Sequence, residues 1–89
     1  MADKAVRRCF VCGSANCIHE HHVYGGKNRK MSEKYGMKVD LCGRHHNLSL
    51  EGVHFNKELD LMIKRHFQMI FEKQYDREKF MSVFGRSYL

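Results

Sequence analysis

Two short segments in the first half of the chain alternate between apolar and polar residues. Residues 18–23 form the first, and residues 37–41 form the second, with Met37, Val39 and Leu41 on one face. A period of two residues is typical of a half-buried β-strand, so we expect two strands here. The residues between them, 24–36, are too many for a tight hairpin, and we expect them to form a broad loop.

The last third of the chain has the longer period of an amphipathic helix. Residues 57–75 place an apolar stripe on one helix face, which consists of Leu59, Met62, Ile63, Phe67 and Ile70. Asn56 is a good N-cap for this helix because its side chain can accept a hydrogen bond from a first-turn amide. Asp76 is the corresponding cap of a short final helix through Phe84, and Gly85 suits its C-terminal end.

This order of elements predicts an α+β fold in a single domain of 89 residues. Residues 9–55 would form the core of the domain, and residues 56–89 a helical extension. A chain of this length buries only about 60–65% of the surface that its unfolded form exposes. A structural metal would add stability that so small a core does not supply.

Charge and composition narrow the class of protein. Sixteen Lys and Arg against ten Asp and Glu give a net charge of +6, which favours a polyanionic partner such as nucleic acid. Residues 1–8 lack the apolar core of a signal peptide, and no stretch approaches the length of a membrane span. We therefore expect a cytoplasmic protein without a membrane partner, in which the four cysteines bind metal rather than form disulfides.

The cysteines lie at spacings typical of a zinc site. Cys9 and Cys12 form a C-x-x-C turn, and Cys42 and His45 repeat the same two-residue spacing. Structural zinc takes four such ligands in a tetrahedron, so we assign these four residues to it. Cys17 is the rival for the fourth place, but its spacing suits zinc less well, and we expect a small buried side chain there.

Two adjacent histidine pairs provide further ligands. Adjacent residues of a strand face opposite sides, so His21 and His22 cannot both address one site. If His45 binds zinc, His46 points about a quarter-turn away from it on a helix. One histidine of each pair can therefore bind a second metal, and the other member of the first pair remains free to act as a base.

These motifs resemble those of the HNH endonucleases, the ββα-metal or His-Me finger family. The resemblance rests on Cys9–Cys12, on His21-His22-Val23 and on Leu41-Cys42-Gly43-Arg44-His45-His46, and it covers residues 9–46 closely. It implies a zinc-stabilised ββα-metal core in which His21 and His46 bind a catalytic divalent metal and His22 is the general base. The small, basic chain is similar to stand-alone HNH proteins of phages and prophages.

The sequence departs from the family pattern in two places. His45 stands where many members have a fourth cysteine, and zinc accepts either ligand. Met37 occupies the position of the family's middle asparagine, whose orienting role would pass to Asn28, to Asn47 or to no residue.

Three further histidines lie outside these two pairs. His54 follows His46 by eight residues, and it is either a third ligand of the catalytic metal or a surface residue. His19 is expected to face solvent from the first strand. His66 falls in the apolar stripe of the long helix, so we expect a core histidine bonded to a backbone carbonyl.

A cluster of cations directly follows the proposed base. Lys27, Asn28, Arg29 and Lys30 come after two glycines, which allow close approach of the backbone to phosphate. We expect these residues, together with Arg44, to contact DNA.

Three functions remain open on these grounds. The first is a metal-dependent DNA endonuclease or nickase that uses Mg²⁺ or Mn²⁺, or Ni²⁺ or Zn²⁺, which imidazole ligands favour. The second is a zinc-stabilised DNA-binding module without turnover. The third is an accessory of a phage packaging or recombination complex. The chain would act as a monomer or a homodimer, with Leu61, Phe80, Phe84 and Tyr88 either forming a dimer surface or covering the core.

Overall fold

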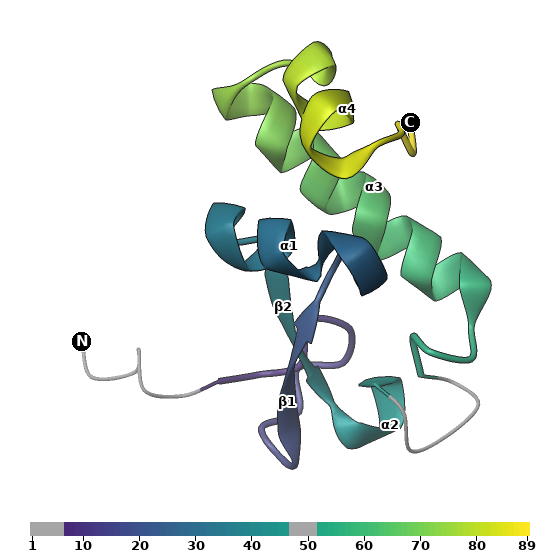
Figure 1. The fold of residues 1–89 in the computed structure, drawn as a ribbon. Helices are drawn as coiled ribbons and strands as arrows, with labels where there is room; N and C mark the ends of the chain where they lie inside the picture. The colour runs from purple at the N-terminus through teal and green to yellow at the C-terminus, as the bar shows by residue number, and fades with distance from the viewer. Residues whose placement is uncertain (1–6, 47–51) are drawn as a thin grey trace.

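The computed structural model of the chain describes residues 7–46 and 52–89 (Figure 1). These residues form a small α+β fold, as the sequence pattern predicts. Its elements, in chain order, are β1 (Ile18–His22), a 3₁₀ helix η2 (Gly26–Asn28), α1 (Arg29–Tyr35), β2 (Lys38–Cys42), α2 (Gly43–His46), α3 (Lys57–Gln74) and α4 (Arg77–Phe84).

The two strands pair antiparallel in a two-stranded sheet. Ile18 lies opposite Cys42, and His21 lies opposite Val39. Val39 and Leu41 are buried on the inner face, which confirms the alternation expected for the second strand. Both strands therefore occur within one residue of the predicted bounds.

The prediction of a broad loop between the strands is wrong, because these residues form η2 and α1. The buried hydroxyl of Ser32 explains why the chain folds back here. It accepts a hydrogen bond from the Tyr24 amide at 3.0 Å and donates one to the Tyr24 carbonyl at 2.7 Å. Gly36 ends α1 at φ +73°, a conformation that glycine adopts without strain.

Both helix caps predicted for the C-terminal half are confirmed. The Asn56 side chain accepts from the Leu59 amide, and the Asp76 side chain accepts from the Lys79 amide. Gly85 ends α4 in the left-handed conformation, as expected. The starts of α3 and α4 are thus set by local side-chain hydrogen bonds.

The buried face of α3 differs from the predicted stripe. Ile63 and Phe71 are buried, whereas Met62 and Ile70 are 49% and 40% exposed. His66 is also exposed, and its ring lies 5.2 Å from that of Phe10, so the expectation of a core histidine is wrong. The buried face includes Phe71 instead of Ile70, because the Phe71 ring packs against Phe80 and Phe84 of α4.

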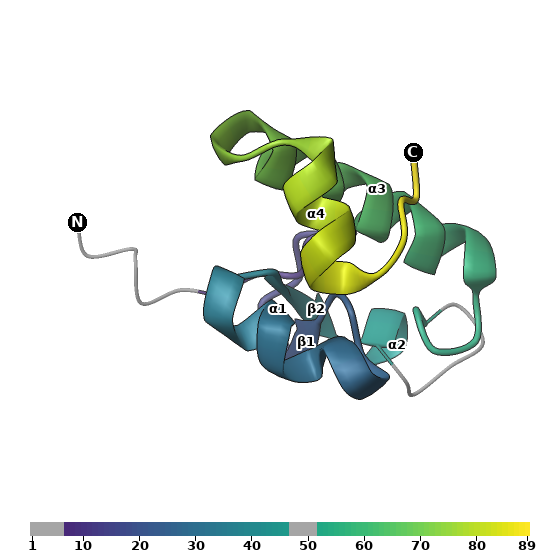
Figure 2. The ribbon, with the colours of Figure 1, turned by 45° about the horizontal axis from the view of Figure 1, so that its top comes forward.

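Helices α3 and α4 lie against one another (Figure 2), and an aromatic cluster joins them to Tyr24, which follows β1. Phe80 lies 5.4 Å from Phe71, and Phe84 lies 4.4 Å from Tyr24 between ring centroids. Phe80 and Phe84 are buried, so they cover the core rather than offer a dimer surface. The Tyr24 hydroxyl also donates to the Lys64 carbonyl of α3 at 2.6 Å.

We predict that Tyr24→Phe lowers the free energy of unfolding of the zinc-loaded protein by about 1 kcal/mol, because it removes the hydrogen bond to α3 but keeps the ring. Urea unfolding monitored by circular dichroism measures the change. Tyr75→Phe is the control because Tyr75 is 46% exposed, and equal stability of the two variants would contradict the prediction.

Candidate functional site

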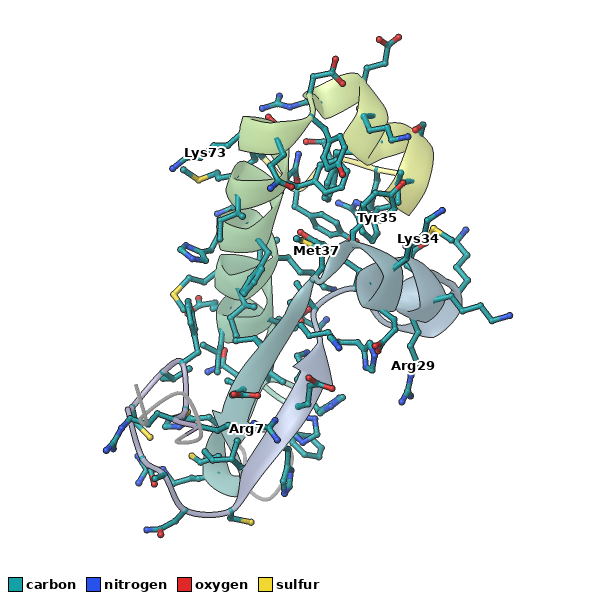
Figure 3. All side chains as sticks on the ribbon, turned by 90° about the vertical axis from the view of Figure 1, so that its left-hand side faces the viewer. Arg7, Arg29, Lys34, Tyr35, Met37 and Lys73 are labelled. Atoms are coloured by element: carbon teal, nitrogen blue, oxygen red, sulfur yellow. The ribbon has the colours of Figure 1, made fainter. Side chains whose placement is uncertain are left out.

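The cysteine turn lies against the far end of β2. The Cys9 amide donates to the Ser14 carbonyl at 2.8 Å, and the Gly13 amide donates to the Cys9 carbonyl at 2.9 Å. The Phe10 amide donates to the Asp40 carbonyl of β2 at 2.8 Å. Arg7 adds an ion pair with the Asp40 carboxylate (Figure 3), at 2.6 Å. These contacts bring the turn to the junction of β2 and α2.

Cys9, Cys12, Cys42 and His45 meet there in a group that can hold a metal such as zinc. The Cys12 and Cys42 sulfurs are 3.7 Å apart, and His45 Nδ1 lies 3.4 Å from Cys42 Sγ and 3.8 Å from Cys9 Sγ. Zinc bonds of about 2.3 Å to sulfur and 2.0 Å to nitrogen at tetrahedral angles place ligand atoms roughly 3.5–3.8 Å apart. The geometry therefore fits zinc.

The backbone around Cys9 favours its thiolate form. Burial raises the pKa of Cys9, but hydrogen bonds from the backbone at Cys42, Cys12 and Val11 outweigh it and lower the pKa to about 6. The Val11 amide, for example, donates to Cys9 Sγ at 3.4 Å. A thiolate is the form that binds zinc, so these hydrogen bonds would favour metal binding by Cys9.

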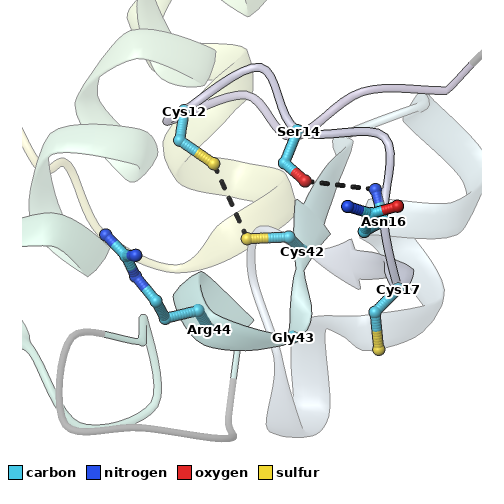
Figure 4. A pocket seen from close by; sticks show the side chains of 7 residues that line it. All are labelled: Cys12, Ser14, Asn16, Cys17, Cys42, Gly43 and Arg44. Atoms are coloured by element: carbon cyan, nitrogen blue, oxygen red, sulfur yellow. Dashed lines mark hydrogen bonds between the residues drawn. The ribbon is translucent and has the colours of Figure 1, made fainter.

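Cys17 differs from its prediction, whereas Arg44 lies beside the cysteine group as its place in the sequence suggests. Cys17 is exposed, rather than buried, and its sulfur points away from Cys12 and Cys42 (Figure 4). Arg44 lines a cavity of about 270 Å³ together with Cys12, Cys17 and Cys42. The predicted contact of Arg44 with DNA stays a prediction.

A second group of possible metal ligands comes from three separate segments. His21 lies on β1, His46 on α2 and His54 in the segment that precedes α3. Two backbone hydrogen bonds attach this last segment to α2: Val53 N–H donates to the His45 carbonyl at 2.8 Å, and His54 N–H donates to the His46 carbonyl at 3.2 Å. These bonds bring His54 to the site.

The three histidines are close enough to share one ion. One nitrogen from each lies within 4.8 Å of the others, and the Nε2 atoms of His46 and His54 are 3.1 Å apart. Metal–nitrogen bonds of about 2.0–2.1 Å place two ligand nitrogens roughly 3.0–3.4 Å apart. The first alternative for His54, as a third member of this group, thus agrees with its position.

The His21 side chain has the properties of a possible metal ligand. Its Nε2 atom is buried and has no hydrogen-bond partner among the described residues. Burial, followed by the charges of His46 and His54, lowers the pKa of His21 to about 4. The ring is therefore neutral at physiological pH and keeps a lone pair that a cation can accept.

His22 lies beside this group but faces a different partner. Its Nε2 atom is 2.8 Å from a Glu33 carboxylate oxygen on α1. This contact, together with Lys38, holds the pKa of Glu33 below its usual range. His22 also lines a cavity of about 310 Å³ with the three histidines, Glu20, Gly25, Gly26 and Arg29. The same cavity is therefore lined by the three possible metal ligands and by His22, which contacts Glu33.

Of the cations predicted to contact DNA on η2 and α1, Arg29 lines this cavity. Lys27, Arg29 and Lys30 are exposed on η2 and α1, and Arg29 extends outward from α1 (Figure 3). Asn28 instead donates from its side chain to the Phe84 carbonyl at 2.9 Å. That bond connects η2 to α4, which gives Asn28 a structural contact.

His19 does not face solvent as expected, because it is half-buried and contacts His46. The two Nδ1 atoms are 2.9 Å apart. The sequence offers a weak signal for this contact, since His19 and His21 are two residues apart and so share a face of β1. Met37 is buried in the core and cannot replace the family's asparagine, and Asn47 lies outside the described residues.

Comparison with protein-family models, with curated proteins and with solved structures finds no match to this chain. No described helix has the length and apolar content needed to cross a membrane.

We predict that Cys42→Ala loses the bound zinc and leaves the chain largely unfolded, because zinc binding in small sites contributes about 10–16 kcal/mol of folding free energy. Metal analysis of the purified protein, together with circular dichroism, measures both effects. Cys17→Ser is the matched control, since its sulfur lies outside the cluster and the variant should retain zinc. A Cys42→Ala chain that folds normally would disprove the structural role.

Proposed function

We propose that the protein is a metal-dependent DNA endonuclease or nickase of the HNH type, with a ββα-metal core. One observation carries this proposal: His21, His46 and His54 converge in a cavity that His22 also lines. Metal-dependent phosphodiester hydrolysis uses a divalent cation and a base beside the same phosphate, and this cavity could supply both.

The order of the elements supports the same proposal. β1 supplies His21 and His22, β2 returns antiparallel to it, and α2 follows with His46. This is the strand–strand–helix arrangement that the sequence resemblance implies. The cysteine group at the junction of β2 and α2 would be its structural zinc site.

The catalytic step requires that His22 take a proton from water. The contact of His22 Nε2 with Glu33 favours the tautomer in which Nε2 carries the hydrogen and Nδ1 accepts the proton. The hydroxide then attacks phosphorus, and the bond from phosphorus to the 3′ oxygen breaks. A bound divalent ion would neutralise phosphate charge and stabilise the leaving oxygen.

Glu33 takes over an orienting role in this proposal. Met37 is buried and Asn28 bonds to Phe84, so neither can orient the reacting groups. Glu33 contacts the proposed base directly and is itself held by Lys38 at 2.9 Å. A carboxylate that contacts one ring nitrogen of a histidine sets the tautomer and the orientation of that ring.

The ligand chemistry favours certain metals. Three imidazoles bind Mn²⁺, Ni²⁺ or Zn²⁺ better than Mg²⁺, which prefers oxygen ligands. The site would leave positions open for water and for a phosphate oxygen. A single site of this kind cuts one strand, so a monomer would nick DNA and a homodimer could cut both strands.

A second candidate is a zinc-stabilised DNA-binding module, or an accessory of a phage packaging or recombination complex, without independent turnover. The departure at Met37 from the family's asparagine favours it. Nicking of supercoiled plasmid with Mn²⁺ would support the first candidate. Binding without nicking would support the second, and nicking that requires an added partner would support the accessory role.

We predict that replacing Lys27, Arg29 and Lys30 with Ala weakens DNA binding and lowers its salt dependence by up to about three phosphate contacts, because each cation would release counterions from DNA. Fluorescence anisotropy at several salt concentrations measures the slope. A double Ala variant at Lys73 and Lys79 is the control, because it removes exposed cations from α3 and α4. Equal effects per removed charge would show that the cations of η2 and α1 have no special role.

We predict that His22→Ala keeps the fold, the zinc and most of the DNA affinity, but slows plasmid nicking about a hundredfold or more. Loss of the base should be partly reversed by added imidazole. His21→Ala and His46→Ala should instead be rescued in part by excess Mn²⁺, because they would weaken metal binding. His66→Ala is the control, since His66 lies on the exposed face of α3. Nicking by His22→Ala at the wild-type rate would exclude this histidine as the base.

A further inference from the structure

The imidazole of His46 contacts a different histidine with each of its two nitrogens. Nδ1 lies 2.9 Å from Nδ1 of His19, and Nε2 lies 3.1 Å from Nε2 of His54. The rings of His19 and His46 are nearly perpendicular, at 87°, with centroids 5.0 Å apart. His19 therefore meets the edge of His46 that faces away from His54.

A neutral imidazole carries one hydrogen, so these two contacts depend on each other. If His46 carries its hydrogen on Nε2, that nitrogen has no lone pair for a cation. If the hydrogen lies on Nδ1, it is donated to His19 Nδ1, and Nε2 presents its lone pair to the site beside His21 and His54. The His19 contact therefore decides whether His46 is ready to bind metal.

The partner of His19 completes a consistent set of hydrogen positions. If His19 Nδ1 accepts from His46, then His19 carries its hydrogen on Nε2. That nitrogen lies 3.6 Å from Cys17 Sγ, which is a weak acceptor. Cys17 reaches this place with φ at +53°, an unusual conformation for a residue other than glycine. With these hydrogen positions, donation runs from His46 to His19 and on to Cys17.

We propose that His19 is a positioning residue, which accepts a hydrogen bond from His46 Nδ1 and so holds His46 Nε2 ready for a divalent ion. This inference rests on the proposed function of His21, His46 and His54 as the ligands of that ion. His19 itself does not join the ligand group, because its contact is with the opposite edge of the His46 ring. Ligands of metals commonly have such a partner on the second ring nitrogen.

Two substitutions at His19 separate the hydrogen bond from the space that the ring fills. His19→Phe keeps an aromatic ring but removes the acceptor. His19→Asn places an amide oxygen near the position of Nδ1 and keeps the acceptor. His66→Phe is the matched control, because it makes the same change on the exposed face of α3.

The first measurement is the tautomer of His46 in the zinc-loaded protein, read from long-range ¹H–¹⁵N NMR correlations of ¹⁵N-labelled histidine. We expect the hydrogen on Nδ1 in the wild type and in His19→Asn, and a shift toward Nε2 in His19→Phe. A wild-type His46 that carries its hydrogen on Nε2 would overturn the proposal, whether or not any variant folds.

The second measurement is the affinity of the zinc-loaded protein for Mn²⁺, titrated by electron paramagnetic resonance. Loss of a partner of this kind weakens metal binding by about ten- to a hundredfold, which we expect for His19→Phe. His19→Asn and His66→Phe should stay close to the wild type. Zinc content and circular dichroism establish that each variant is folded.

The outcomes distinguish this inference from the function on which it rests. Equal Mn²⁺ affinity of folded His19→Phe and wild type would overturn the positioning role and leave the metal site intact. A wild type that binds no Mn²⁺ at these histidines would overturn the proposed metal site, and the positioning role with it. Rescue by Asn but not by Phe would support the hydrogen bond as the cause.

Discussion

The arrangement of the histidines depends on the side chain of His45. This residue is buried against Cys9 and Cys42, and it belongs to a helix of only four residues, which is too short to be stable by itself. Metal binding by the cysteine group would hold α2 in place. Because His46 is the next residue on this helix, the same contact determines where its ring lies. A structural site and a proposed catalytic site thus meet at two adjacent residues.

The sheet provides the second constraint on the site. Residues of β1 alternate between its faces, so His19 and His21 lie on the side of α2 and His22 lies toward α1. His21 joins the metal ligands on one side, while His22 meets Glu33 on the other. Both side chains still line the same cavity, so one strand supplies a possible metal ligand and the proposed base to it. Val39 lies opposite His21 and is buried, which resists a slip of the register.

The sequence predicted the parts of this structure that have local signals. The C-x-x-C turn, the alternating strands and the caps at Asn56 and Asp76 each depend on neighbouring residues, and the structure has them in the expected places. Helix α1 was missed because Gly25 and Gly26, followed by four polar residues, suggested a loop between the strands. The Ser32 hydrogen bonds that turn the chain there join residues eight apart, which no short pattern reveals.

The remaining differences arise from packing between distant segments. The buried face of α3 follows Phe80 and Phe84 of α4, which the helical period of α3 alone does not contain. The contact of His19 with His46 joins β1 to α2 through two residues that are 27 positions apart in the sequence. His54 was an open alternative, because its position depends on backbone bonds to α2 that the sequence does not encode as a motif.

The proposed catalytic site is also a place where the fold gives up stability. The buried Nε2 atom of His21 lacks a partner among the described residues, and such a group costs about 1–3 kcal/mol. A hydrogen-bond donor at this place would remove that cost, but it would also occupy the lone pair that a cation needs. A bound divalent ion would satisfy His21 and bridge β1, α2 and the segment before α3. Ion binding should therefore stabilise the fold by mass action as well as permit hydrolysis. The unpartnered nitrogen thus lowers the stability of the fold without an ion, and it leaves the proposed site open to a metal.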